Sequence, residues 1–449
     1  MSNLQEQVRK LIKYGNKKFN LNETNLRDII DNASVGDGSG FGDYKVNSVI
    51  DDNGITQTLE IISENYTPSV TYGVKIDLAN SNPETSVTYT DDSIGFDSSY
   101  MDFANDVFVY GSWQDKFPFN QVKPCILKDG VVSVYLNPNN YAEDIDGNPV
   151  DITSTCDGNV MIEIPKVYYR LHNDGNYQYV QISDKAQEGF CCLAHTYKGV
   201  EKDKIYIGAY DAYNSDSIAR SVSGVTSTGG KNLSTWRNYC QANGLGYECF
   251  TWDILILLQC LYTIQFKNLD SQSVLGYGFS GAGSITTSAT NGTLNNYGLN
   301  YGKASHYSMK FLGLENLYGS KAITIDGVLL TSDSNILVID STMSNSYYND
   351  TGSGYVNRGG TSGVTPIAYT TQIIGTNEGG FMPTISNGSS STYYCDVCLI
   401  GTTSGNIPNF GGFSNSGSDT GMFSMRFNTH PNGNFLYTAT HTTRLVYFG

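Results

Sequence analysis

Short strand-like runs separated by turn residues dominate this sequence, and they constrain its fold more than any other feature. From about residue 72 onward, β-branched and aromatic residues recur in runs bounded by Asp, Asn, Gly or Pro. The clearest runs lie at residues 73–77, 86–89, 131–136, 160–164, 177–182 and 204–210. Two segments predict helices instead: residues 234–243, with Ser234 as the N-cap, and residues 253–264. The pattern predicts a loop-rich α+β fold.

The first 71 residues predict two small segments ahead of one large domain. Residues 1–35 carry apolar residues at helical spacing and are expected to serve in attachment or oligomerisation. An amphipathic helix packed on its own domain is the alternative. After a glycine-rich joint at 36–43, residues 44–71 predict a small β module, a hairpin around an Asp-Asp-Asn-Gly turn. Because no second linker follows, residues 72–449 are expected to form one domain.

Charge and hydropathy exclude several classes of partner. The chain has 27 basic and 43 acidic residues and a net charge of −16, whereas a nucleic-acid-binding protein needs a basic surface. The longest apolar run, residues 254–262, is too short to cross a bilayer. The charged first residues contain no signal peptide, which predicts synthesis in a cytoplasm. We expect neither nucleic-acid binding nor membrane insertion.

Motifs that carry chemistry are scarce. The nine cysteines are irregularly spaced, which predicts free and mostly packed thiols, and the five histidines are scattered singly. Residues 144–148 begin like a calcium loop but lack its Glu at position twelve, so a hairpin turn is expected. Cys395 and Cys398 form a lone CxxC pair, which is a weak signal for redox or zinc chemistry. We therefore expect no metal site, no cofactor and no catalytic residue, and a protein that is not an enzyme.

The last sixty residues have the composition of a binding surface. Segments 389–394, 409–415 and 429–435 mix Tyr and Phe with Ser, Gly and Asn. Rigid aromatic side chains give contact area at a low entropic cost, and small polar residues supply adaptable hydrogen bonds. The same composition also fits the Gly/Asn turns of a sheet-rich surface.

An ordered set of runs across residues 72–449 resembles a known family. They include VTYTDDSIGF around Thr88–Asp91, VMIEIPKVYYR (160–170), ISDKAQEGF (182–190), KIYIGAYDAY (204–213), residues 253–278, GGFMPTISNGSSSTYYCD (379–396), FGGFSNSGSDTGMF (410–423) and RLVYFG (444–449). Together they resemble the C-type-lectin-fold domain of phage tail-fibre and receptor-binding proteins, especially the variable proteins of diversity-generating retroelements. One departure is that Phe413 stands where family members often carry Trp.

The resemblance implies that helices and a framework sheet hold a small exposed antiparallel sheet, with a variable binding surface at about 390–447. It implies the framework positions Gly379, Phe381, Pro383, Gly411, Gly412, Gly421, Phe423, Arg444 and Leu445. Arg444 is expected to tie the last strand to neighbouring carbonyls or carboxylates. The implied ligand contacts are Tyr393, Tyr394, Asp396, Cys398, Leu399, Phe413, Asn415, Ser424, Arg426, Phe427 and His430. Each could instead be half-buried sheet packing, and we expect about half of them to face ligand.

The resemblance also implies a function. We expect a virion receptor-binding protein, located in a phage tail fibre, that binds a bacterial surface glycan or protein without catalysis. Its other expected partners are phage tail or baseplate proteins. The chain is expected to form a homotrimer that adheres to the host. One alternative is an oxidase of the formylglycine-generating type, using copper and a cysteine pair drawn from Cys191, Cys192, Cys395 and Cys398. Others are a glycan-processing tail enzyme, a purely structural tail component and a bacterial surface adhesin.

Overall fold

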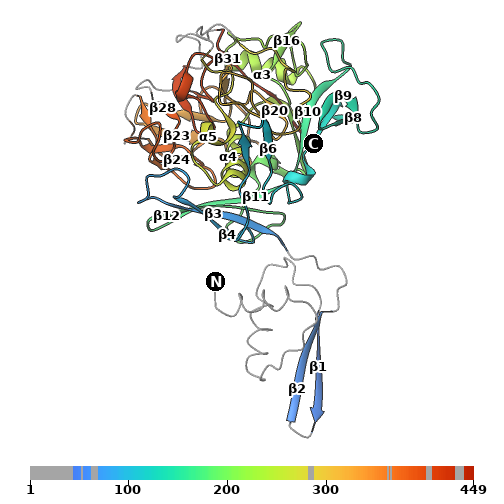
Figure 1. Ribbon diagram of the computed structural model, residues 1–449, viewed down its shortest axis with the longest axis vertical. Helices are drawn as coiled ribbons and strands as arrows, with labels where there is room; N and C mark the ends of the chain where they lie inside the picture. Colours follow the sequence, from blue (N-terminus) through green and yellow to red (C-terminus); the bar gives the residue numbers. More distant parts are fainter. Residues whose placement is uncertain are drawn as a thin grey trace. The chain divides into compact units, whose positions relative to one another are not determined.

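The chain divides into two compact units. The computed structural model describes residues 44–51, 54–61, 69–281, 288–361, 364, 367–400, 407–429 and 439–449. The first unit is Met1–Val70, and the second is Thr71–Gly449. In the first, β1 (Tyr44–Asp51) and β2 (Gly54–Ile61) form an antiparallel hairpin in which Asp51 pairs with Gly54 (Figure 1). Both expected strands are confirmed, whereas the expected helical segment 1–35 and the joint 36–43 lie outside the described residues.

The chain is mixed but strand-rich, with 36% strand and 11% helix, which confirms the expectation of an α+β fold at that level. All six strand-like runs named from the sequence coincide, within two residues at each end, with β3, β4, β8, β10, β12 and β15. Among the described residues, no helix is long and apolar enough to cross a membrane.

A seven-stranded antiparallel sheet forms the framework of the second unit. Its order is β18 (Tyr247–Cys249), β32 (Leu445–Phe448), β15 (Lys204–Gly208), β10 (Asn159–Pro165), β7 (Lys123–Lys128), β8 (Val131–Asn137) and β9 (Asn140–Asp144). The last strand, β32, is inserted between β15 and β18, with Ile207 opposite Val446 and Cys249 opposite Leu445. The C-terminal strand is therefore paired on both sides within the framework sheet.

A four-stranded antiparallel sheet lies under the long helix α4 (Figure 1). Its order is β11 (Tyr168–Asp174), β12 (Tyr177–Ser183), β3 (Thr71–Asp77) and β4 (Val87–Asp91). Val74, Val180 and Ile182 are buried, whereas their neighbours Lys75 and Tyr179 are only half-buried. This alternation is typical of a sheet with one face on the core and one face toward solvent.

Three α-helices are described, of which α4 is central. They are α3 (Leu233–Gln241), α4 (Trp252–Phe266) and α5 (Ser271–Leu275). All fifteen residues of α4 are buried, and the helix contacts β3 and β12. Gln259 Nε2 donates to the Met422 carbonyl at 2.9 Å, so α4 also supports the C-terminal region. The expected helix at 253–264 is confirmed.

The N-cap expected for α3 is wrong by two residues. The cap is Asn232, whose Oδ1 accepts the Thr235 amide at 2.8 Å. Ser234 Oγ donates to the same Asn232 oxygen at 3.1 Å and lies inside the helix. Both Asn and Ser are good N-caps, and only the backbone of this segment decides which one takes the position.

Short strands and 3₁₀ turns complete the second unit. One three-stranded sheet has the order β22 (Val328–Leu330), β23 (Asn335–Val338), β24 (Val356–Gly360). Five two-stranded pairs are β5/β6 (Tyr100–Asp102, Val107–Val109), β13/β14 (Thr196–Tyr197, Val200–Glu201), β16/β17 (Tyr213–Ser215, Ile218–Arg220), β19/β20 (Lys310–Phe311, Leu314–Glu315) and β26/β27 (Gln372–Ile373, Pro383–Ile385). The 3₁₀ turns are η1 (Phe119–Gln121), η2 (Leu193–His195) and η3 (Gly417–Asp419). The remaining six strands form the C-terminal sheet.

Candidate binding site on the C-terminal sheet

The C-terminal sheet is mixed rather than antiparallel. Its order is β25 (Ala368–Tyr369), β28 (Val397–Ile400), β30 (Met425–Thr429), β29 (Ile407–Phe410), β21 (Ala322–Thr324) and β31 (His441–Thr442). The pairs β28·β30 and β21·β31 are parallel. The implied antiparallel sheet is therefore wrong in this detail. Although β29 follows β28 in the chain, β30 lies between them in the sheet.

Register divides this sheet into a packed face and a more open face. Cys398, Met425 and Phe427 are buried on one face. Leu399 pairs with Arg426 across β28 and β30, and both are only half-buried on the other face. Successive side chains along a strand point to opposite faces, so each of these strands turns one apolar row inward.

The open face extends toward the sheet edge at β25. Tyr369 pairs with Val397, which is two residues before Leu399 and so shares its face. Tyr369 is half-buried, and its hydroxyl donates to Asp419 Oδ1 at 3.4 Å. Asp419 ends η3, in the segment that follows β29. The face thus gathers residues from three separate parts of the chain.

Six of the eleven expected contact residues are buried: Tyr394, Asp396, Cys398, Phe413, Ser424 and Phe427. A buried side chain offers no contact area to a ligand at the surface, so for these six the packing alternative holds in the structure. Tyr393, Leu399 and Arg426 are half-buried, and Asn415 is exposed. His430 lies outside the described residues.

Asp396 is an internal anchor. Its carboxyl accepts the Ser271 hydroxyl at 3.0 and 3.1 Å and the Phe423 amide at 2.8 Å. Burial raises the pKa of Asp396 well above its usual range, while the hydrogen bonds oppose that shift. Gly421 allows this close approach, because a Cβ there would lie 2.2 Å from Asp396 Oδ1. The implied framework role of Gly421 therefore has a physical basis.

Tyr394 links two sheets through the core. Its hydroxyl donates to Gln178 Oε1, on β12, at 2.8 Å. Its ring packs edge-on against Phe423, with 5.0 Å between centroids, and also contacts Phe381. A Tyr in a Ser- and Tyr-rich run can therefore serve the core as well as a surface, provided that its hydroxyl finds a partner.

Arg426 is the most distinctive group on the open face. Its guanidinium lies over the Phe413 ring, 4.9 Å from the centroid, and Nη2 donates a long hydrogen bond of 3.4 Å to Ser416 Oγ. Nε is buried and finds no hydrogen-bond partner among the described residues. Burial lowers the pKa of Arg426, and the negative charge of Asp419 opposes that shift. Within the described parts of the chain, no carboxylate lies within ion-pair distance of Arg426.

Tyr369 and Asp419 were not predicted from the sequence. Tyr369 belongs to a strand of only two residues, and Asp419 to a Ser/Gly-rich loop. Neither position carries a periodic or motif signal. They come to the same part of the sheet as Arg426 only through the strand register and the position of the segment after β29.

Arg444 fulfils its expected role. The side chain is fully buried, and Nη1 donates to the carbonyls of Gly208 and Ala209, each at 3.1 Å. Nη2 forms an ion pair of 2.9 Å with Asp211 Oδ1 and donates to the Glu315 carbonyl. The last strand is thereby tied to neighbouring carbonyls and a carboxylate, as expected.

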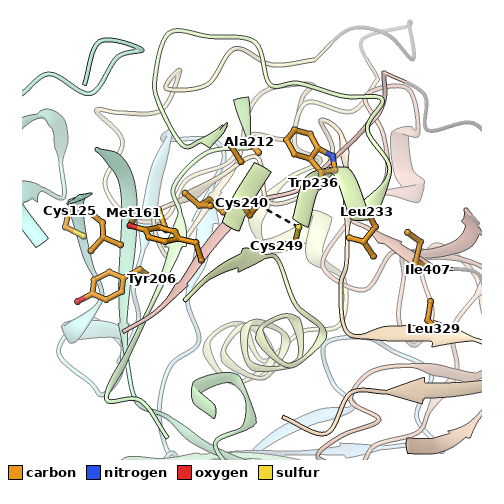
Figure 2. Close-up of a cluster of buried hydrophobic side chains, with 14 residues drawn as sticks. Cys125, Met161, Tyr206, Ala212, Leu233, Trp236, Cys240, Cys249, Leu329 and Ile407 are labelled. Atoms are coloured by element: carbon orange, nitrogen blue, oxygen red, sulfur yellow. Dashed lines mark hydrogen bonds between the residues drawn. The ribbon is translucent and has the colours of Figure 1, made fainter. Parts of the chain in front are cut away.

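The thiols and the acidic loop behave as structural elements. All nine cysteines are free, and all except the half-buried Cys191 are buried. Cys240 and Cys249 approach to 3.8 Å between sulfurs in an apolar cluster that includes Trp236 (Figure 2). Burial raises the pKa of Cys191 and of Cys192 to about 12.

The Asp144–Asn148 segment is a turn, as expected, because Asp144 Oδ1 accepts the amides of Asp146 and Asn148. In the part of the chain that the structure describes, no three His, Cys, Asp or Glu side chains are grouped so that they could hold a metal ion.

Comparison with known proteins adds no family assignment. No protein-family model matches the chain. No curated protein gives a significant match to it.

Proposed function

We propose that this chain is a receptor-binding protein of a phage virion, made in a bacterial cytoplasm and displayed in a tail fibre. Its C-terminal sheet would bind a glycan or protein of the bacterial surface, without catalysis. The open face of this sheet carries the proposal: half-buried Tyr369, Leu399 and Arg426 lie on it, while the opposite face is core. Polar and aromatic groups held on rigid strands are what a binding surface needs.

The family resemblance supplies the rest of the proposal. A C-type-lectin-like domain with a variable surface at about 390–447, diversified by a retroelement, would change side chains here while keeping the backbone. The buried anchors are suited to such a framework, because Asp396 and Tyr394 tie the segment before β28 to the core and Arg444 ties the segment before β32 to it. Assembly as a trimer on tail or baseplate proteins would let several weak sites give firm attachment.

Cell binding by the full chain tests this function. Fluorescently labelled protein is titrated onto a panel of bacterial strains, alongside two single variants. Leu399→Asp places a charge on the open face and is expected to weaken binding about tenfold or more. Leu245→Ser changes an exposed leucine (98% exposed) between α3 and β18, and binding should be retained.

Two outcomes would contradict the proposed function. One is a wild-type chain that binds no strain of the panel. The other is equal binding by wild type and Leu399→Asp, since the open face would then take no part. Thermal unfolding of each variant shows whether a loss of binding reflects a loss of folding.

A further inference from the structure

Arg426 offers hydrogen-bond donors that the described part of the chain leaves largely unused. Its only hydrogen bond within the described residues is the long contact of 3.4 Å from Nη2 to Ser416 Oγ. The guanidinium carbon lies over the Phe413 ring, 4.9 Å from its centroid. A cation–π contact of this kind leaves the N–H groups of a guanidinium available to other acceptors. The aromatic ring therefore positions Arg426 without consuming its donors.

Asp419 provides an acceptor near those donors, because both residues contact Ser416. The Asp419 amide donates to the Ser416 carbonyl at 3.1 Å, and Arg426 Nη2 donates to Ser416 Oγ at 3.4 Å. The charge of Asp419 acts on Arg426, yet the two side chains lie beyond ion-pair distance. From side chains in the described ranges, the Asp419 carboxylate accepts only one long hydrogen bond, 3.4 Å from the Tyr369 hydroxyl. Asp419 is half-buried, and its neighbour Ser418 is exposed. A cation and an anion thus face the same region of the open face without pairing directly.

A group that both accepts and donates hydrogen bonds would complete this arrangement. A sugar hydroxyl does both, because its oxygen accepts from a guanidinium while its proton is donated to a carboxylate. Charge-assisted hydrogen bonds of this kind are stronger than those between neutral groups. We propose that Arg426 and Asp419 together bind adjacent hydroxyl groups of a neutral saccharide. This inference rests on the proposed function and narrows its receptor from glycan or protein to glycan.

The surroundings favour a neutral glycan over the other two candidates. A carboxylated or phosphorylated ligand at Arg426 would meet the charge of Asp419, and the chain as a whole carries −16. A protein partner needs a desolvated apolar centre. Here Asn415, Ser416 and Ser418, in the segment that contacts Arg426, are polar and at least partly exposed. Of the two apolar side chains named on the open face, Leu399 is half-buried and Val397 is buried.

Chemical treatment of the receptor tests the inference. Cells of a strain that the wild-type chain binds are divided into three samples before the full chain is added. Mild periodate oxidises adjacent hydroxyl groups to aldehydes by cleaving the carbon–carbon bond between them. Protease removes surface proteins, and carbodiimide with glycinamide neutralises carboxylates. We expect periodate to reduce binding about tenfold or more and the other two treatments to leave it within about twofold.

Variants of the two charged residues locate the contact. Asp419→Asn and Arg426→Gln should each weaken binding about tenfold, and Arg426→Lys should weaken it less, because it keeps the charge but loses the planar fork. Arg170→Gln is the matched control, a half-buried arginine on β11 of the four-stranded sheet, and should bind like wild type. If Arg426→Gln misfolds, the binding of Asp419→Asn to the same cells decides whether the two charged residues contact the receptor.

The outcomes separate this inference from the proposed function. A strain bound equally well before and after periodate would overturn the inference while leaving receptor binding intact. Loss of binding after protease but not after periodate would point to a protein receptor and would overturn the inference too. Loss after carbodiimide but not after periodate would point to an acidic glycan, with the same consequence. A panel in which no strain is bound would contradict the proposed function, and the inference would fall with it.

Discussion

Arg444 and Asp211 form an ion pair of 2.9 Å in which both side chains are buried, at the point where the last strand enters the framework sheet. Arg444 also donates to the carbonyls of Gly208, Ala209 and Glu315. Burial raises the pKa of Asp211 to about 6, while the charge of Arg444 opposes that shift. This single side chain therefore satisfies several buried acceptors at once.

We expect Arg444→Met to destabilise the chain by about 3–5 kcal/mol, because it leaves a buried carboxyl and several carbonyls without a donor. The control is Arg358→Met, which removes a partly exposed pair of 3.6 Å with Glu378 and should cost about 1 kcal/mol or less. Urea unfolding followed by circular dichroism measures both. If the two variants lost equal amounts of unfolding free energy, the Arg444 network would not be a major source of stability.

Gly421 is expected to be one of the least replaceable residues of the C-terminal region. A Cβ there would lie 2.1 Å from Ser271 Oγ and 2.2 Å from Asp396 Oδ1, so Gly421→Ala should cost about 3 kcal/mol. Both Gly421 and Gly417 have a positive φ. A Cβ at position 417 would meet nothing within 4 Å, so Gly417→Ala should cost only about 1 kcal/mol. Thermal melts of the two variants would refute the Asp396 anchor if Gly417→Ala were the more damaging.

Stability should fall as pH rises from about 4 to about 7, partly because of Asp253. Burial raises the pKa of Asp253 from 3.8 to about 7, with Glu378 and Asp340 adding to the shift and Ser341 and Arg358 opposing it. Over this range the folded chain holds a proton that the unfolded chain releases, so unfolding becomes easier. The titration of Asp253 alone should lower the free energy of unfolding by about 4 kcal/mol over this range.

Asp253→Asn imitates the protonated carboxyl and should flatten this dependence. Urea unfolding at a series of pH values measures the slope for both proteins. A variant with the slope of the wild type would mean that Asp253 does not titrate in this range.

The thiols should be largely unreactive in the folded chain. Cys191 is the one cysteine that is not fully buried, and its pKa is raised to about 12 by burial. Because the thiolate is the reactive form, we expect Ellman's reagent at pH 8 to modify Cys191 slowly and the others more slowly still. All nine should react in denaturant. Rapid reaction of Cys395 or Cys398 in the folded chain would contradict this prediction and support the oxidase alternative.

The sequence predicts the framework better than the site. The helix at α4 could be predicted from its run of helix-forming apolar residues, and β10 from a short apolar run bounded by turn residues. In β12 the alternation of buried and more exposed residues indicates a strand directly. The role of Arg444 could also be predicted, but from the family resemblance, because its partners Asp211 and Glu315 are distant in the chain.

The binding face could be predicted only in part. The resemblance implies ligand contacts at Leu399, Arg426 and Asn415, which are at least partly exposed. It implies them equally at Tyr394 and Asp396, which are buried. What separates them is a partner far along the chain: Gln178 for Tyr394 and Ser271 for Asp396. Such pairings arise from the tertiary fold and leave no trace in local composition.

Photo-crosslinking from the open face tests the central proposal most directly. Benzoylphenylalanine is placed at position 415, where Asn415 is exposed, and separately at position 177, where Tyr177 is 37% exposed on the four-stranded sheet. Each full-length protein is irradiated on cells of a strain that the wild type binds. We predict crosslinks to cell-surface material from position 415 and none above background from position 177. Crosslinks from position 177 with none from position 415 would contradict the proposal that the C-terminal sheet binds the receptor.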